Sequence, residues 1–287
     1  MATMFFGQYL LAKSAIDRAA LLDALDRQRR SNLSLPELAV REGLMDASRA
    51  DAVAAAYRMS DRPIETILVD TGGLSAEHVE RLKNKQRSSW LRIGAALVEG
   101  GHLSDEDIAR HLEDYRSMES AADQRIRDAM RHLPDAEAVS SCVELSVFHF
   151  ARVTGRPAKL ESVSVETAEL ETGRRRFAQR IAGDGDYTIA VDLPPELAAA
   201  VARGMLGFAV DPGSESESDA VCEYLNLIGG NACTRIEQLG RLLRPDPPTW
   251  VDQVDAATGH DPAVRATVVS GDTPFEVSVF TGGRETA

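Results

Sequence analysis

A carboxylate and a carboxamide stand three residues apart in the segment from Asp219 to Asn231, which reads Asp-Ala-Val-Cys-Glu-Tyr-Leu-Asn-Leu-Ile-Gly-Gly-Asn. At 3.6 residues per helical turn, Glu223 and Asn226 share one face of a helix, and Gly230 follows one turn later. Asp219 lies one turn earlier on the same face. An amide can hold a water molecule because it offers an acceptor and donors without a negative charge. These residues therefore predict a small polar platform that another protein can approach closely.

The platform belongs to a longer helical pattern, which we expect to continue to about Leu243. Apolar residues recur at helical spacing on the side opposite the platform: Val221, Leu225, Ile228, Ala232, Ile236 and Leu239. Such a stripe predicts burial against a core. Residues 211–218 are turn formers and acids, which predict a loop before the helix, and the proline-rich segment 244–248 breaks the chain after it.

The segments around this helix predict an α+β domain. A helix is expected over 136–153, stopped by the segment 154–157, and another over 196–206, opened by Pro194-Pro195 and ended by Gly207. Alternating or β-rich runs predict strands over 160–165, 174–181, 187–193, 250–254, 264–269 and 275–280, with a hairpin turn over 270–273. The sum is a largely antiparallel sheet with long helices packed on one face.

The N-terminal part repeats with a period of 29 residues, in four units anchored at Gly7, Pro36, Glu65 and Gly94. Each unit predicts a short helix, a tight turn and a second helix. The turn positions are Ser14, Gly43, Gly72 and Gly101, and the N-caps of the second helices are Asp17, Asp46, Ser75 and Ser104. No unit can bury its apolar face alone, so the four should stack on one another. The expected organisation is an all-α repeat module over 1–118, a linker helix over 119–136 and the α+β domain over 137–287.

Charge and composition exclude several classes of function. The 287 residues carry a net charge of −13, of which residues 1–118 carry −2 and the remainder −11. Such acidity repels phosphate backbones, so we expect no nucleic-acid binding by the C-terminal part, and it suits a partner with a lysine-bearing face. Three cysteines and six histidines lack metal-ligand spacing, so no metal site is expected. Without a membrane-spanning run or a signal-peptide pattern, the expected location is the cytoplasm.

The pattern Asp219-x-x-x-Glu223-x-x-Asn226-x-x-x-Gly230 resembles the signature of the CheC/CheX/FliY chemotaxis phosphatases. The resemblance covers roughly residues 137–280. It includes the strand over 187–193 and the following Pro-Pro-Glu-Leu-Ala helix. A single copy of the motif is the arrangement of CheX. The resemblance implies an enzyme that dephosphorylates CheY-like response regulators, and a homodimer formed through sheet edges.

The resemblance also implies a role for each residue of the motif. Asn226 would orient the attacking water, and Glu223 would dock by pairing with a lysine of the regulator. Gly230 would let the regulator's backbone approach, and Asp219 would serve the start or the structure of the helix. The regulator would bring Mg²⁺, so we expect no cofactor bound by this chain itself.

The repeats resemble the N-terminal helical domain of GspE/MshE-type secretion and pilus ATPases, in which paired motifs can bind cyclic di-GMP. The last unit keeps Arg92, Gly94 and Gly101 of that motif, but Tyr115 stands where a glutamine belongs. An arginine matters because its guanidinium can stack on or bond to a guanine. Because only the last of the four units keeps this arginine, a purely structural module is favoured over nucleotide binding.

The leading hypothesis from sequence is a two-domain signalling phosphatase, with the repeat module as its regulatory or docking part. The alternative is a non-catalytic adaptor or a cyclic di-GMP-responsive scaffold that keeps the CheX-like fold for protein binding or dimerisation.

Overall fold

The computed structural model describes residues 5–60, 62–133, 135–166, 173–251 and 263–282. The chain divides into two compact units, with the boundary between Ala121 and Ala122. This boundary lies within one long helix, which takes up most of the segment expected as a linker. Among the described residues, no helix combines the length and the apolar character that crossing a bilayer requires.

The N-terminal unit consists of four helix pairs over its described residues, one for each sequence repeat. They are α1 (Phe6–Ala12) with α2 (Arg18–Ser31), α3 (Leu35–Arg41) with α4 (Ala47–Arg58), α5 (Ile64–Asp70) with α6 (Ala76–Ser89), and α7 (Ile93–Glu99) with α8 (Asp105–Arg131). The predicted side-chain caps are confirmed, because Asp17, Asp46 and Ser75 each accept a hydrogen bond from a backbone N–H of the following helix. Ser104 does the same for α8, at 3.1 Å from the backbone nitrogen of Asp107.

The tight turns follow the repeat in three units and depart from it in one. Ser14, Gly43 and Gly101 have positive φ angles of 53°, 70° and 71°. In the third unit the prediction of Gly72 as the turn residue is wrong, because the positive φ of 67° falls on Gly73. There the backbone N–H of Leu74 reaches back to the carbonyl of Leu68, which makes this turn one residue longer than the others.

The first repeat packs against the fourth, and the second repeat packs against the third. The four repeats therefore do not form one successive stack. One buried cluster joins residues of the first and fourth units, such as Leu10 and Leu97, and another joins the second and third, such as Leu38 and Leu82. In each of these two pairs of repeats, a glutamine at the same repeat position forms a hydrogen bond to the other repeat of the pair. Gln28 donates to the main-chain oxygen of Leu91, and Gln86 donates to that of Leu33, each at 2.9 Å.

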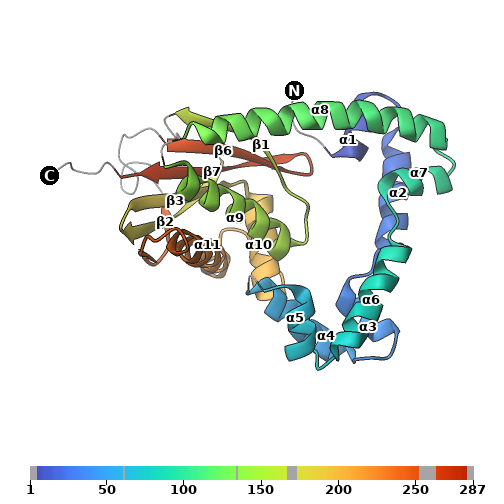
Figure 1. The fold of residues 1–287 in the computed structure, drawn as a ribbon, viewed down its shortest axis with the longest axis horizontal. Helices are drawn as coiled ribbons and strands as arrows, with labels where there is room; N and C mark the ends of the chain where they lie inside the picture. The colour runs from blue at the N-terminus through green and yellow to red at the C-terminus, as the bar shows by residue number, and fades with distance from the viewer. Residues whose placement is uncertain (1–4, 61, 134, 167–172, 252–262, 283–287) are drawn as a thin grey trace. The chain divides into compact units, whose positions relative to one another are not determined.

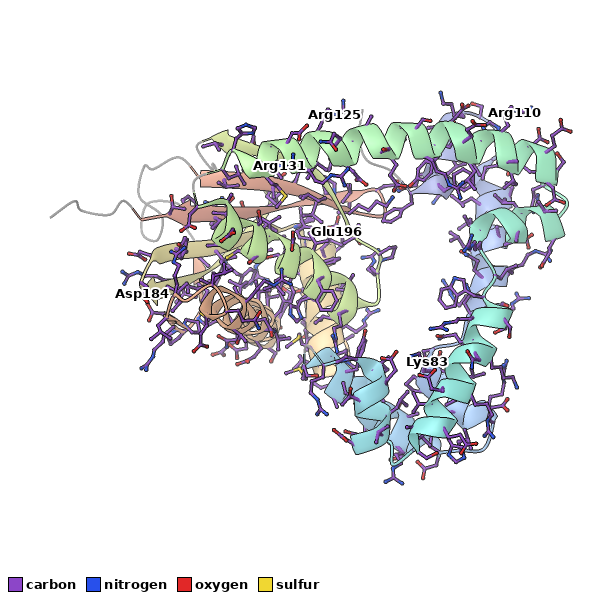
Figure 2. The ribbon with its side chains drawn as sticks, viewed as in Figure 1. Lys83, Arg110, Arg125, Arg131, Asp184 and Glu196 are labelled. Atoms are coloured by element: carbon purple, nitrogen blue, oxygen red, sulfur yellow. The ribbon has the colours of Figure 1, made fainter. Side chains whose placement is uncertain are left out.

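An ion pair also joins two helices on the surface of the second and third repeats. Lys83 lies on α6 (Figure 2), 3.2 Å from the carboxylate of Glu65 on α5. Glu65 occupies the anchor position of the third repeat, where the first and last units carry glycine. The repeat therefore keeps its backbone pattern while the chemistry at this position changes.

The C-terminal unit is built on one antiparallel sheet. Its helices are α9 (Ala136–Thr154), α10 (Pro195–Leu206) and α11 (Glu215–Glu237). Its strands are β1 (Lys159–Glu166), β2 (Arg175–Gly183), β3 (Asp186–Leu193), β4 (Leu243–Pro245), β5 (Thr249–Val251), β6 (Ala263–Ser270) and β7 (Thr273–Thr281). The strand order is β1-β6-β7-β3-β2-β4, and β5 also pairs with β2.

The sequence located most of these elements. The expected α+β fold is confirmed, and the hairpin turn between β6 and β7 contains Gly271 with a φ of 63°. Gly155 and Gly207 end α9 and α10 in the left-handed conformation. The short strand β4 was missed, because two of its three residues lie in the proline-rich segment that indicated a break and the third, Leu243, was expected to end the helix. Of the strand expected over 250–254, residues 252–254 lie outside the described part.

The three helices α9, α10 and α11 lie beside one another on one face of the sheet (Figure 1). Alternate strand residues face these helices and are fully buried, among them Phe177, Ile189, Val191 and Val277. Together with the apolar sides of the helices they form a single large core cluster. This core fixes α11 against β2, which is the contact that shapes the candidate site.

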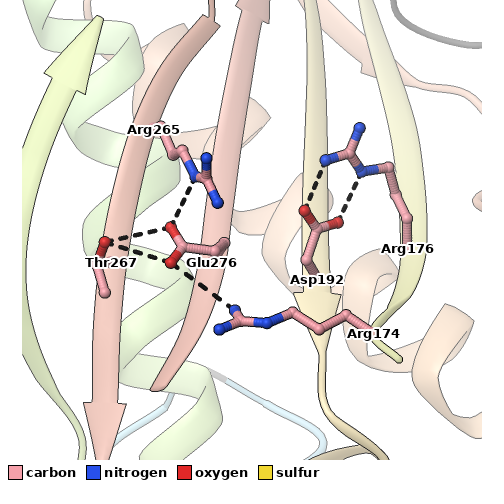
Figure 3. Close-up of polar contacts among 6 residues, drawn as sticks. All are labelled: Arg174, Arg176, Asp192, Arg265, Thr267 and Glu276. Atoms are coloured by element: carbon pink, nitrogen blue, oxygen red, sulfur yellow. Dashed lines mark hydrogen bonds and ion pairs between the residues drawn. The ribbon is translucent and has the colours of Figure 1, made fainter. Parts of the chain in front are cut away.

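The opposite face of the sheet carries a buried row of ion pairs across four strands (Figure 3). Arg176 of β2 donates two hydrogen bonds of 2.7 and 2.6 Å to the carboxylate of Asp192 of β3, and both side chains are buried. Glu276 of β7 lies 3.1 Å from Arg265 of β6 and 3.7 Å from Arg174. Burial raises the pKa of the Glu276 carboxyl, although Arg265 opposes the shift. Each acid in this row is matched by arginine, as buried charges require.

Candidate functional site

The candidate site lies on α11, which begins earlier than the sequence indicated. Ser214 caps the helix by accepting a hydrogen bond from the backbone N–H of Glu217 at 3.2 Å. Residues 215–218 therefore belong to the helix, and the prediction that they form a loop is wrong. The acidic side chains in this first turn stabilise the positive end of the helix dipole.

β2 anchors the start of this helix through a charged pair. Glu217 is buried and forms an ion pair with Arg175 of β2, which also donates to the hydroxyl of Ser218 at 2.7 Å. Arg175, Phe177 and Gln179 alternate along β2 and face α11, so the same strand contacts the helix again further on. The sheet thus sets both the position and the rotation of the platform.

The predicted apolar stripe is confirmed except at its end. Val221, Leu225, Ile228, Ala232 and Ile236 have no exposed surface. Leu239, expected in the same stripe, is 47% exposed because α11 ends at Glu237 and the chain turns away at Gly240. The expectation that the helix continues to Leu243 is therefore wrong.

Glu223 and Asn226 are brought together on the outer face of α11. The amide nitrogen Nδ2 of Asn226 lies 3.3 Å from the carboxylate oxygen Oε2 of Glu223. Glu223 is exposed, whereas Asn226 is half-buried at the edge of the sheet. Asp219 is exposed one turn before Glu223. The platform predicted from the spacing is therefore present and open to a partner.

A residue that the sequence analysis missed holds the amide of Asn226. Gln179 of β2 is 1% exposed, and its Nε2 atom donates to Oδ1 of Asn226 at 2.9 Å. The same nitrogen donates to the main-chain oxygen of Asp246 at 2.8 Å. A signal was available, because Gln179 is a polar residue in the alternating position between the core residues Phe177 and Ile181.

The two glycines of α11 have different surroundings. A Cβ atom on Gly229 would lie 2.2 Å from Oε1 of Gln179, so a side chain at this position would displace the glutamine amide. A Cβ atom on Gly230 would meet nothing within 4 Å. None of the described residues therefore requires glycine at 230, and the open backbone there faces outward.

The thiol of Cys222, which lies beside the platform, is not activated as a nucleophile. Burial raises the pKa of Cys222, and the carboxylates of Asp219 and Glu223 raise it further. The thiol therefore stays protonated, and the thiolate is the reactive form. Among the described residues, no group of three or more histidine, cysteine or acidic side chains could hold a metal ion.

Of the residues considered for nucleotide binding, the two glycines have structural reasons to be where they are. Gly94 lets α7 pack closely on α8, since a Cβ atom there would lie 2.9 Å from Cγ2 of Ile108. Gly101 forms the left-handed turn after α7. Arg92 is exposed and lines a surface pocket with Gln86, Arg87 and Trp90. Cyclic di-GMP binding here stays a prediction, as does the resemblance to GspE/MshE.

Comparison with known proteins identifies the C-terminal part of the chain. Residues 178–269 match a family model described as chemotaxis phosphatase CheX. This segment runs from β2 to β6 and contains the whole of α11, so this region is a CheX domain. No curated protein matches the chain.

Several solved structures resemble the chain over about half its length. The chemotaxis protein CheX from Desulfovibrio desulfuricans is 19% identical with a TM-score of 0.45, and the match covers 51% of this chain and 99% of that one. CheX from Vibrio vulnificus is 15% identical with a TM-score of 0.45, covering 51% and 99%. CheX in a CheX–CheY–BeF3–Mg complex from Borrelia burgdorferi is 15% identical with a TM-score of 0.42, covering 50% and 97%.

Proposed function

We propose that the C-terminal domain hydrolyses the aspartyl phosphate of a CheY-like response-regulator receiver. The observation that carries the proposal is the contact between the exposed Glu223 and the half-buried Asn226 on the outer face of α11, inside a region that matches the CheX family model. The partner class comes from this family match and from the residue pattern. The receiver would bring its own phosphoryl group and Mg²⁺.

Hydrolysis of an acyl phosphate needs a water held in line with phosphorus. The water oxygen forms the new bond to phosphorus, the bond to the aspartyl oxygen breaks, and the carboxylate leaves with the electron pair. The proton released by the water passes to a phosphate oxygen. Asn226 orients the water without adding a negative charge near the phosphoryl oxygens. Its contribution is therefore positioning, the main component of phosphoryl-transfer catalysis.

The other platform residues serve docking. Glu223 is exposed and can pair with a lysine of the receiver. Gly230 presents open backbone one turn beyond Asn226, so a receiver loop can approach without meeting a side chain. Asp219 lies at the other end of the platform, in the second turn of α11, so its role is in the structure of the helix; the expected role in starting the helix is wrong, because Ser214 caps it. The N-terminal repeats act as a regulatory or docking module for the same cytoplasmic pathway.

The test is release of phosphate from a phosphorylated receiver with wild-type protein and with Asn226→Ala. Wild type should accelerate release over the receiver's own decay, and Asn226→Ala should lower kcat on the order of 100-fold, because positioning losses reach this size. The apparent KM should change little, since docking remains.

Two results would contradict the proposal. If wild type gives no acceleration with any receiver that binds it, the domain is a non-catalytic adaptor. If Asn226→Ala is as fast as wild type, an activity exists but the assigned mechanism is wrong.

A further inference from the structure

Gln179 sits beneath the platform in a place where a polar side chain is costly. It occupies a helix-facing position of β2 between Phe177 and Ile181, both of which are fully buried. Its Oε1 atom is buried and has no hydrogen-bond partner among the described residues. An unsatisfied buried acceptor destabilises the folded state, because the hydrogen bond it made to water is not replaced. A leucine or methionine would fill this position without that cost, so the glutamine needs another reason to be there.

The contacts of Gln179 fix which end of its amide faces which neighbour. The main-chain oxygen of Asp246 only accepts hydrogen bonds, so the atom 2.8 Å from it must be the donor Nε2. Asp246 is held in place because its own N–H donates to the main-chain oxygen of Arg180 at 2.8 Å. On its other side, Oε1 of Gln179 packs against Gly229, so both ends of the amide are in contact with backbone. The orientation of Gln179 is therefore set by the backbone around it.

The orientation of the Gln179 amide determines the orientation of the Asn226 amide. The atom of Asn226 that faces Nε2 at 2.9 Å must be an acceptor, which is Oδ1. The amide nitrogen Nδ2 then points outward to the carboxylate of Glu223, at 3.3 Å. Rotation of the Asn226 amide by half a turn would set two NH₂ groups against each other. One lone pair of Oδ1 and one hydrogen of Nδ2 are left for a water.

We propose that Gln179 is the positioning residue that fixes the direction of the Asn226 amide, so that the same donor and acceptor always face the attacking water. The inference rests on the proposed phosphatase function. It adds a residue outside the Asp-x-x-x-Glu-x-x-Asn-x-x-x-Gly pattern. Gln179 touches neither the water nor the phosphate and acts through Asn226.

The kinetic test compares Gln179→Met with wild type on a phosphorylated receiver. Methionine keeps the length but donates no hydrogen bond, so kcat should fall about tenfold with the apparent KM within about twofold. In an Asn226→Ala background, the same change should have no further effect on kcat. Gln124→Met, on the exposed surface of α8, is the matched control and should keep wild-type rates.

A second variant gives a signature that lost packing would not produce. In Gln179→Glu, the ionised carboxylate only accepts and would draw Nδ2 of Asn226 inward, whereas the protonated acid can again donate to Oδ1. The kcat of Gln179→Glu relative to wild type should therefore rise as pH falls from 8 to 6. A pH-independent ratio, or Gln179→Met with kcat within twofold of wild type, would overturn the inference.

An NMR measurement decides the orientation even if the domain proves inactive. In the full chain with ¹⁵N-labelled asparagine, nuclear Overhauser effects should join the Nδ2 protons of Asn226 to the side chain of Glu223. They should weaken in Gln179→Met, because the amide can then turn over. Unchanged effects in that variant would contradict the inference. An inactive wild type with these effects lost in Gln179→Met would reject the phosphatase function and leave the orienting role of Gln179 standing.

Discussion

Glu223 and Asn226 share one helix face but differ in how firmly they are held. Asn226 is half-buried and receives a hydrogen bond from the rigid strand β2 through Gln179. Glu223 is exposed, and its contact with Asn226 is long at 3.3 Å. A fixed amide suits the orientation of a water, and an exposed, loosely held carboxylate suits pairing with an incoming lysine. The two environments agree with the two roles proposed.

At the residue scale, removing the charge of Glu223 should weaken docking and spare the chemical step. Glu223→Gln keeps an oxygen that can accept from Asn226. We expect the apparent KM for the phosphorylated receiver to rise about three- to tenfold, the range of a single charge pair at an interface, with kcat within about twofold. The dependence of KM on salt should also become weaker.

The matched control for this prediction is Glu237→Gln, at the far end of the same helix, which should leave KM unchanged. A fall in kcat with an unchanged KM for Glu223→Gln would move Glu223 from docking to the chemical step.

At the scale of the element, α11 is positioned by its contacts with β2 more than by its own sequence. Arg175 holds its first turn, Gln179 holds its middle, and Gly229 makes room for the glutamine. Asparagine and the two glycines are poor helix formers. The helix is nevertheless intact over 215–237 because its apolar side is fully buried in the core.

The neighbouring glycines of α11 give a paired prediction. Gly230→Ala should raise the free energy of unfolding by up to about 1 kcal/mol, because alanine is the better helix former and has open space there. It should also raise the apparent KM, because the added methyl group lies where the receiver approaches. Gly229→Ala should instead destabilise the domain and lower kcat, since its Cβ atom would displace Gln179.

Denaturant unfolding and receiver kinetics on both variants check this pair. Equal effects of the two substitutions on stability would show that Gln179 can move to make room for a methyl group at position 229, contrary to this prediction.

At the scale of the whole molecule, the chain contains separate cores. Over the residues that the structure describes, the C-terminal unit has one large cluster, and the N-terminal unit has two, one for each pair of repeats. All three cysteines lie in the C-terminal unit. Burial raises the pKa of each of them, and for Cys142 the pKa reaches about 12. The two units should therefore respond differently to alkaline pH.

Between pH 8 and 10 the C-terminal unfolding transition should weaken more than the N-terminal one, because the N-terminal unit holds no cysteine and its buried Tyr9, whose pKa burial raises, begins to ionise in the unfolded chain only near the usual pKa of 10.0. A thiol in the unfolded chain loses its proton from its usual pKa of 9.0 upward, whereas folded Cys142 keeps its proton to about 12. The unfolded state is thus favoured as pH rises, by up to about 1.4 kcal/mol per pH unit for each such group. This contribution to stability is fully present below pH 9 and is lost as pH rises toward 12.

Denaturant melts of the full chain at several pH values test this expectation, with the N-terminal transition as the internal control. Cys142→Ala should flatten the slope of the C-terminal transition. A C-terminal transition that is constant from pH 8 to 10 would contradict the prediction.

The sequence by itself determined the local order of this protein. The 29-residue period, the caps at Asp17, Asp46 and Ser75, and most helices and strands followed from periodicity and from single residues acting on their neighbours in the chain. The spacing of Glu223 and Asn226 also sufficed to put them on one helix face, because helical geometry alone decides it.

Only the tertiary structure decided which distant segments meet. The pairing of first with fourth repeat and the separate roles of Gly229 and Gly230 depend on packing between elements. The clearest case is Gln179, which lies 47 residues before Asn226 and still fixes its amide. Its direction is set by a carbonyl that the fold brings near from another loop. Contacts of this kind follow from burial and sheet register, which no local pattern specifies.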